Sequence, residues 1–225
     1  MGDNGRHEHK HRISYPDYVQ LRARLKYIMK PDENAAEQDG YRVRSLYFDN
    51  YSDKAVVEKL AGLSRREKFR IRLYNNDTSL IRLEKKSKIN LLCYKESAVL
   101  SAEQCSELLN GRLDALRVPE CPLCMELYAK MQFQNLRPRT IVDYRREAYI
   151  YPAGNVRVTF DSYIRMSNQV GGLLDPGLVT IPSASGIVLE VKYDGFIPEM
   201  IRELVQVGDR SQTEFSKYAV SRLVN

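Results

Sequence analysis

The chain has 225 residues, 35 Lys and Arg against 29 Asp and Glu, a formal net charge of +6 and 43% hydrophobic residues. This length suits one large domain or two small ones and is enough to bury a core. The many acids exclude a simple basic tail, and no apolar run approaches the length of a membrane-spanning helix. We find no signal-peptide pattern, and we expect a cytoplasmic protein with reduced cysteines.

The spacing of apolar residues predicts strands that are mostly joined as hairpins, with helices between them. The predicted strands cover 6–14, 41–50, 67–74, 80–88, 91–100, 137–151, 155–167 and 186–194. Apolar residues at helical spacing, with Pro16, Gly62 and Ser101 near helix ends, predict helices over 15–29, 53–63, 101–112, 121–135, 197–208 and 214–224. This order is typical of an antiparallel α+β fold.

Charged residues recur on one face of at least five predicted strands. Alternation places Arg70 and Arg72 on one face of their strand, and Ile71 and Leu73 on the other. The same pattern holds for the first strand and three later ones, whose charged residues are Arg6, Glu8, Lys10, Arg82, Glu84, Lys86, Lys88, Arg157, Asp161, Glu190, Lys192 and Asp194.

Two interpretations of this ionic face are open. An antiparallel sheet often has one wet and one buried face. However, arginine is abundant here and binds phosphate oxygens in bidentate geometry, and the ionic face recurs in nearly every strand. A barrel of about eight strands can hold a ligand, and a phosphate chain would relieve repulsion among inward-facing cations. We therefore expect a closed antiparallel eight-stranded β-barrel with a charged lumen and surrounding helices.

Two other patterns suggest metal sites only weakly. Cys121 and Cys124 form a CxxC motif, but a zinc site would need a second pair of cysteines or histidines, and none lies nearby in the sequence. We therefore interpret both cysteines as small residues in a loop between helices. His7, His9 and His11 alternate on the non-ionic face of the first strand, and we do not expect them to bind metal.

Eight short segments resemble the VTC-type polyphosphate polymerase domain of the triphosphate tunnel metalloenzyme, or CYTH-like, superfamily. In family order from about Arg6 to Tyr218, they are RHEHK, SLYFDN, KFRIRLY, LEKKSK, YRREAY, VRVTFD, LEVKYDG and FSKY. The resemblance implies one tunnel domain over 1–225, with a helical insertion near 101–136. It is closest to the stand-alone bacterial type, which lacks the SPX and transmembrane parts of the fungal complex.

The family resemblance implies an activity and a set of residue roles. The activity is transfer of the terminal phosphate of ATP onto polyphosphate, assisted by Mn²⁺ or Mg²⁺. By matched position, it implies catalytic roles for Lys10, Arg70, Arg72, Lys86, Arg146 and Arg157, substrate binding by Lys217, and metal binding by Glu190. Further candidates on or near the ionic faces are Lys88, Lys95 and Lys192 for substrate, and Glu8 and Glu84 for metal. Lys192, Glu8 and Glu84 have the alternative role of salt-bridge partners.

The sequence departs from the family pattern at two positions. Arg6 replaces the first acid of the ExExK motif of tunnel hydrolases, which argues against two-metal hydrolysis. Glu214 stands where the polymerases have a lysine, which puts one phosphate contact in doubt.

Three other functions are alternatives to the polymerase. One is a tripolyphosphatase or nucleoside triphosphatase of the same fold, and another is a non-catalytic module that binds polyphosphate. Nucleic-acid binding is disfavoured because aromatic residues are not interleaved with the basic ones. The expected partners are ATP and polyphosphate or pyrophosphate, and the fungal complexes suggest a membrane protein as a further partner.

Overall fold

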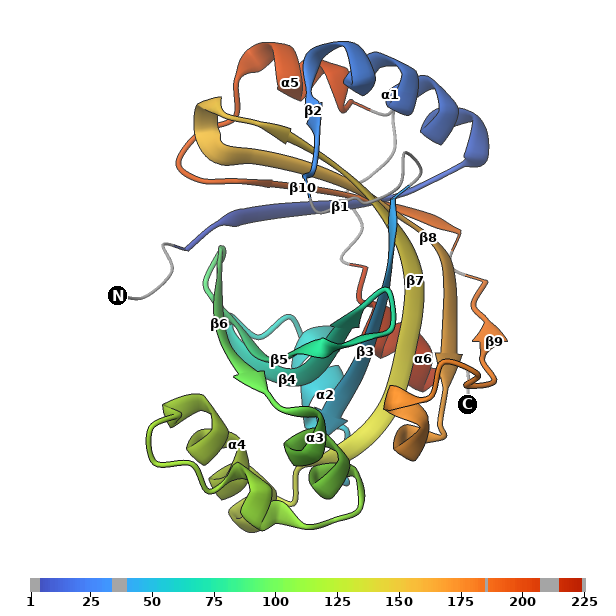
Figure 1. Ribbon diagram of the computed structural model, residues 1–225. Coiled ribbons are helices and arrows are strands. Elements are labelled where there is room, and N and C mark those ends of the chain that lie inside the picture. The colour runs from blue at the N-terminus through green and yellow to red at the C-terminus, as the bar shows by residue number, and fades with distance from the viewer. Residues whose placement is uncertain (1–4, 34–39, 185, 207–214, 224–225) are drawn as a thin grey trace.

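The computed structural model describes residues 5–33, 40–184, 186–206 and 215–223, and a ten-stranded antiparallel sheet forms its centre (Figure 1). Eight long strands follow the order β1-β10-β8-β7-β3-β4-β5-β6. Their bounds are β1 His7–Ile13, β3 Tyr41–Asp49, β4 Arg65–Tyr74, β5 Asp77–Ile89, β6 Leu92–Leu100, β7 Arg137–Tyr151, β8 Val156–Ser167 and β10 Ile187–Tyr193. All eight predicted strands are therefore confirmed.

Two short strands were not predicted. They are β2 (Lys30–Pro31), which pairs with β7, and β9 (Ile181–Pro182), which pairs with β8. A segment of two residues cannot display an alternating pattern, so the sequence carries no signal for either strand.

Helices form where the sequence predicts them, within the described ranges. They are α1 Tyr15–Ile28, α2 Lys54–Leu60, α3 Ala102–Leu109, α4 Pro122–Phe133, α5 Glu199–Leu204 and α6 Lys217–Leu223. Ser14 and Ser101 start α1 and α3 with capping boxes, each accepting a hydrogen bond from a backbone N–H three residues later. In Figure 1, α1 and α5 cover one end of the sheet and α3 and α4 the other. No helix of the described chain is both long and apolar enough to cross a membrane.

The apolar faces of the strands pack against these helices in three clusters. One joins Ile71 and Leu83 of the hairpin to Leu127 of α4. A second joins β8 and β10 to Leu21 and Leu25 of α1, and a third surrounds Tyr218 of α6. The apolar side of the sheet is thus covered by helices, as the alternation predicts.

The sheet bends strongly but is not closed by a ladder of hydrogen bonds. The long strands β7 and β8 curve, which brings β1 and β10 over β4, β5 and β6 (Figure 1). The end strands β1 and β6 meet in one bridge within the described residues, where Arg6 and Cys93 exchange backbone hydrogen bonds of 3.0 Å. The α+β class is confirmed, whereas the predicted closed eight-stranded barrel is not. The reason is that β1 and β6 diverge beyond this bridge.

The prediction of reduced cysteines is wrong for one pair. Cys121 and Cys124 form a disulfide, while Cys93 and Cys105 are free thiols. Cys121 is also not in a loop, because it caps α4 and its Sγ accepts a hydrogen bond from the Cys124 backbone N–H at 3.3 Å. The first turn of α4 holds the two Cα atoms 5.3 Å apart, which is within the range of a disulfide.

The packing of α4 on the sheet predicts a stability difference between two of its residues. Leu127 is fully buried and Phe133 is 87% exposed. Leu127→Ala should lower the free energy of unfolding by about 3 kcal/mol, because it leaves a cavity. Phe133→Ala, the control, should change it by less than about 0.5 kcal/mol. Urea unfolding measures both values, and equal effects would contradict the packing described.

Candidate functional site

Three adjoining cavities lie along the ionic face of the sheet. Their volumes are about 370, 40 and 110 Å³, and we call them the wide cavity, the neck and the rear cavity. The wide cavity and the neck share Arg70, Arg72 and Arg146, among others. The neck and the rear cavity share Lys10 and Lys68. Because neighbouring cavities share walls, they adjoin, and together we call them the tunnel.

Every predicted site residue lines the tunnel. The wide cavity contacts Glu8, Arg70, Arg72, Glu84, Lys86, Lys95, Arg146, Arg157 and Lys192. The neck adds Lys10, Glu190 and Lys217, and the rear cavity adds Lys88. Lysine and arginine outnumber carboxylates in all three cavities. The structure thus brings together residues from seven strands and α6. Glu214 lies outside the described residues.

Strand register explains how these side chains meet. Arg70 of β4 is directly opposite Glu84 of β5, and Lys10 of β1 is opposite Glu190 of β10. Directly opposite residues of antiparallel strands place their side chains on the same face. The charged residues that alternate along each strand therefore form one continuous charged surface on the sheet.

Most tunnel cations form ion pairs with a carboxylate. Arg70 donates to Glu84 at 2.7 Å, and Arg146 holds Asp161 through two hydrogen bonds of 2.7 and 2.8 Å. Burial by itself would raise the pKa of Glu84, but Arg70 and Arg72 hold it well below its usual value. Arg146 likewise outweighs burial and lowers the pKa of Asp161 to about 2. These carboxylates are therefore charged at neutral pH.

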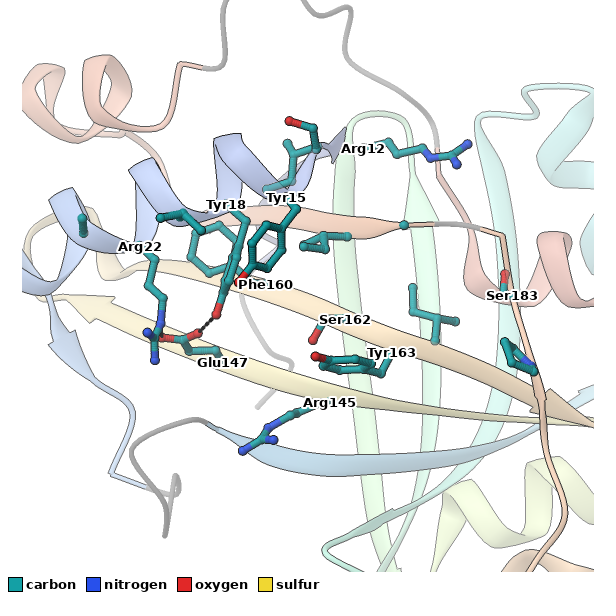
Figure 2. Close-up of a pocket in the computed structure, with 18 of the residues that line it drawn as sticks. Arg12, Tyr15, Tyr18, Arg22, Arg145, Glu147, Phe160, Ser162, Tyr163 and Ser183 are labelled. Carbon is teal, nitrogen blue, oxygen red and sulfur yellow. Dashed lines mark hydrogen bonds and ion pairs between the residues drawn. The ribbon is translucent and has the colours of Figure 1, made fainter.

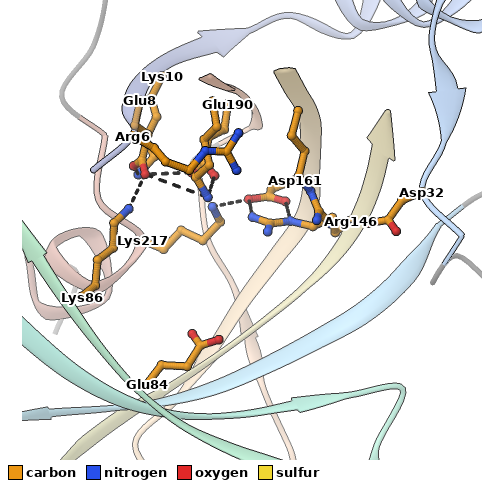
Figure 3. Close-up of polar contacts among 12 residues, drawn as sticks. Arg6, Glu8, Lys10, Asp32, Glu84, Lys86, Arg146, Asp161, Glu190 and Lys217 are labelled. Carbon is orange, nitrogen blue, oxygen red and sulfur yellow. Dashed lines mark hydrogen bonds and ion pairs between the residues drawn. The ribbon is translucent and has the colours of Figure 1, made fainter. Parts of the chain in front are cut away.

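Glu8 and Glu190 form a pair of neighbouring carboxylates (Figure 3). Lys10 contacts both of them, and its Nζ lies 3.3 Å from Glu190 Oε2. Lys192 Nζ lies 2.5 Å from Glu190 Oε1 and 3.9 Å from Glu8 Oε2, yet Glu190 Oε1 accepts no hydrogen bond of good geometry. Glu84 stands apart from this pair and contacts Arg70 and Arg72 instead.

The Glu8 and Glu190 pair fits the oxygen ligands that Mg²⁺ and Mn²⁺ prefer. Within the described residues, no three His, Cys, Asp or Glu side chains gather into a site that could hold a metal alone. Mg²⁺ is commonly held by one or two carboxylates together with substrate phosphates. Glu8 and Glu190 are consistent with that arrangement.

Lys68 is the tunnel residue that the sequence analysis missed. It lines both the neck and the rear cavity. Its position two residues before Arg70 put it on the ionic face by parity, so the signal was present in the alternation. Tyr144 was noted as part of a motif without a role. Its hydroxyl accepts a hydrogen bond from Arg72 at 3.1 Å.

The largest cavity of the molecule is elsewhere, with a volume of about 1410 Å³ (Figure 2). It lies on the outer side of the sheet between α1 and β8, where Glu147 accepts hydrogen bonds from Tyr18 at 2.8 Å and Arg22 at 2.7 Å. None of the predicted site residues lines it. We take the tunnel rather than this cavity as the candidate site, because the predicted site residues line the tunnel.

Comparisons with known proteins identify a similar fold and a family for the chain. The chain is similar in structure to a Bacillus halodurans protein whose assignment as an adenylate cyclase is provisional, with 15% identity, 96% of each chain covered and a TM-score of 0.55. The Pyrococcus horikoshii protein PH1819 is 11% identical over 98% of this chain and 99% of that chain, with a TM-score of 0.49. No curated protein matches by sequence. The family model of the VTC domain matches residues 5–224, so the chain belongs to the VTC domain family.

Proposed function

We propose that the protein is a metal-dependent polyphosphate polymerase, which transfers the terminal phosphate of ATP onto a growing polyphosphate chain in the tunnel. The observation that carries this proposal is the set of three adjoining cavities in which cations outnumber carboxylates. Such a surface suits a long polyanion better than a compact substrate. Membership of the VTC domain family supports the same substrate class.

The proposed reaction needs positioning and charge neutralisation more than covalent chemistry. The bond between the γ-phosphorus of ATP and its bridging oxygen breaks, a terminal oxygen of the acceptor bonds to that phosphorus, and ADP leaves. The acceptor phosphate is already ionised at neutral pH, so no general base is required. Arg70, Arg72 and Arg146, which line the wide cavity, would bind the non-bridging oxygens and stabilise the charge that develops on them.

Glu190 and Glu8 would hold the divalent metal in this proposal. When bound, the metal would neutralise charge on the phosphates. Lys10 and Lys192 contact the two carboxylates in this structure. In this proposal both lysines would also bind phosphate oxygens.

A tunnel triphosphatase is the competing function, and Arg6 argues against it. Arg6 Nε forms an ion pair with Asp194 at 2.8 Å beside the wide cavity. The hydrolase motif has a carboxylate at this position, and Arg6 supplies a cation instead. The tunnel thereby has one ligand fewer for a second metal and one cation more for phosphate.

Incubation with ATP and Mn²⁺, with and without a short polyphosphate primer, tests the proposed function directly. We expect a ladder of polyphosphate on a gel, release of ADP and little free phosphate. Free phosphate without a ladder would instead identify a hydrolase. Polyphosphate binding without either product would identify a binding module.

Glu190→Gln should separate catalysis from binding. We expect turnover to fall by about a hundredfold or more, because metal stabilisation worth several kcal/mol is lost. Metal-free polyphosphate should bind equally well or more tightly, because a buried negative charge is removed from the tunnel. Glu199→Gln on exposed α5 is the control and should retain both properties. Full turnover by Glu190→Gln in the presence of metal would refute the metal role.

Arg72→Ala should weaken polyphosphate binding by about tenfold or more, because a charge-assisted hydrogen bond is worth about 1.5–3 kcal/mol. Arg65→Ala, on an exposed position of the same strand, removes an equal charge outside the tunnel and should change the affinity by less than about threefold. Calorimetric titration of both variants measures the difference. Equal losses would show that net charge, rather than the tunnel, determines affinity.

A further inference from the structure

The cavity of about 1410 Å³ between α1 and β8 is an open groove, which we call the outer groove (Figure 2). It lies on the face of the sheet opposite the tunnel, because Arg145 and Glu147 of β7 line it, whereas Arg146 between them lines the tunnel. Among the described residues, none lines both the outer groove and the tunnel. A ligand in the outer groove would therefore occupy a site separate from the one proposed for phosphate.

Cations dominate the charge of the outer groove. The charged residues that line it are Arg12, Arg22, Lys26, Arg145, Arg165 and Glu147. Glu147 already accepts hydrogen bonds from two side chains of α1. Arg12, Lys26 and Arg165 are exposed and form no ion pair with a carboxylate of the described chain. Arg12 and Arg165 each donate to a backbone carbonyl, and a guanidinium has five N–H donors. Carboxylates of a ligand would complement this charge.

Aromatic rings form the apolar part of the outer groove. Tyr18 of α1 packs edge-on against Phe160 of β8 with ring centres 5.1 Å apart, and the Tyr15 ring lies 5.9 Å from that of Tyr18. Phe160 is buried, whereas Tyr15 and Val19 are 68% and 46% exposed. The lining has four tyrosines and four arginines against one lysine and one glutamate. Tyrosine and arginine are enriched at protein–protein interfaces, where lysine and the acids are depleted.

Tyr163 lines the outer groove with a strained backbone. Its φ of 51° lies in the left-handed region, which a bulky residue rarely adopts. It stands where the pairing of β7 and β8 shifts by a β-bulge, a feature that often re-aims a side chain. The side chain is 76% exposed, so packing within the described chain does not account for a tyrosine here. Strain of this kind is typical of residues that contact a ligand.

The size and lining of the outer groove indicate the class of ligand. Its volume exceeds the range of about 300–1,000 Å³ that is usual for small-molecule sites, so a segment of a macromolecule suits it better. Single-stranded nucleic acid would need separate rings on which bases can stack. Tyr15, Tyr18 and Phe160 instead pack against one another and form an apolar surface. Such a surface suits apolar side chains, and the surrounding arginines suit carboxylates.

We propose that the outer groove binds an acidic, partly apolar segment of a partner protein. Carboxylates of the segment pair with Arg12 and Arg165, and its apolar side chains pack on Tyr15, Val19 and Tyr163. This inference goes beyond the proposed polymerase activity and does not depend on it. The partner would bind the reverse face of the strands that line the tunnel, so binding and catalysis use different side chains.

Selection from a phage-displayed library of random peptides, with the full chain as the target, tests this proposal. Fluorescence anisotropy then measures the affinity of the selected peptides for the wild type and for matched variants. Arg165→Gln removes a cation of the outer groove, and Arg24→Gln removes an exposed cation of α1 outside it. Tyr163→Asn removes the strained ring, and Tyr51→Asn removes a tyrosine that is 89% exposed and lies outside the groove.

We expect the selected peptides to be rich in acidic and apolar residues. Arg165→Gln should weaken their binding by about tenfold, because a charge-assisted hydrogen bond is lost, and Tyr163→Asn by about fivefold or more. Arg24→Gln and Tyr51→Asn should change the affinity by less than about twofold. Arg72→Ala, in the tunnel, should bind the peptides as the wild type does. Tyr163→Asn should melt no lower than the wild type, because asparagine adopts the left-handed conformation more readily.

Several results would overturn the proposal. One is a selection that enriches no acidic peptide, and another is peptide binding that is unchanged in both Arg165→Gln and Tyr163→Asn. Loss of binding in Arg72→Ala would place the peptide in the tunnel. Displacement of the peptide by single-stranded oligothymidylate would identify a nucleic-acid site. Dimers that form in the wild type but not in Tyr163→Asn would show that a second copy of the chain occupies the groove. A protein without polymerase activity that binds the peptides as expected would refute the proposed function alone.

Discussion

Repulsion among like charges is the main physical constraint on the structure of the tunnel. Arginine and lysine side chains from β1, β4, β5, β7, β8 and β10 converge on a narrow space, where water cannot screen them fully. The free protein meets this constraint with carboxylates such as Glu84, Asp161 and Glu190, each buried and each paired with two or more cations. The same cations are available to phosphate oxygens once a ligand replaces those pairings.

This arrangement is possible because the sheet has one charged face and one apolar face. One face of each strand contributes ions to the tunnel, while the other packs Ile71, Leu83 and their neighbours against the helices. The helices thus provide the burial that stabilises the fold, and the tunnel is free to be polar. A cluster of cations of this size would be destabilising on a sheet that lacked such a covered reverse face.

Much of this could be predicted from the sequence because strand alternation is a local signal. Arg70, Glu84 and Glu190 each stand in a long alternating segment, so their shared face follows from parity. The resemblance to the VTC domain family then assigned roles to individual residues on this face. Lys68 was missed although parity places it on the tunnel face, because the family resemblance assigned it no role.

The features that sequence did not predict depend on distances between remote segments. Whether β1 and β6 form a continuous ladder depends on how far β7 and β8 bend, and no local pattern encodes that curvature. The helix over 121–135 was predicted, but the disulfide depends on how closely its first turn brings Cys121 and Cys124 together. In the same way, the sizes of the three cavities follow from how the whole sheet curves.

The pairing of β1 with β10 has a consequence for the order in which the tunnel assembles during synthesis. Arg70 and Glu84 belong to one hairpin, so their ion pair can form as soon as that hairpin leaves the ribosome. Glu8 and Glu190 come from opposite ends of the chain and meet only when β10 joins the sheet. The cation-rich half of the tunnel therefore forms before the carboxylate pair, and under the proposed function a nascent chain would attract polyanions before it could hold a metal.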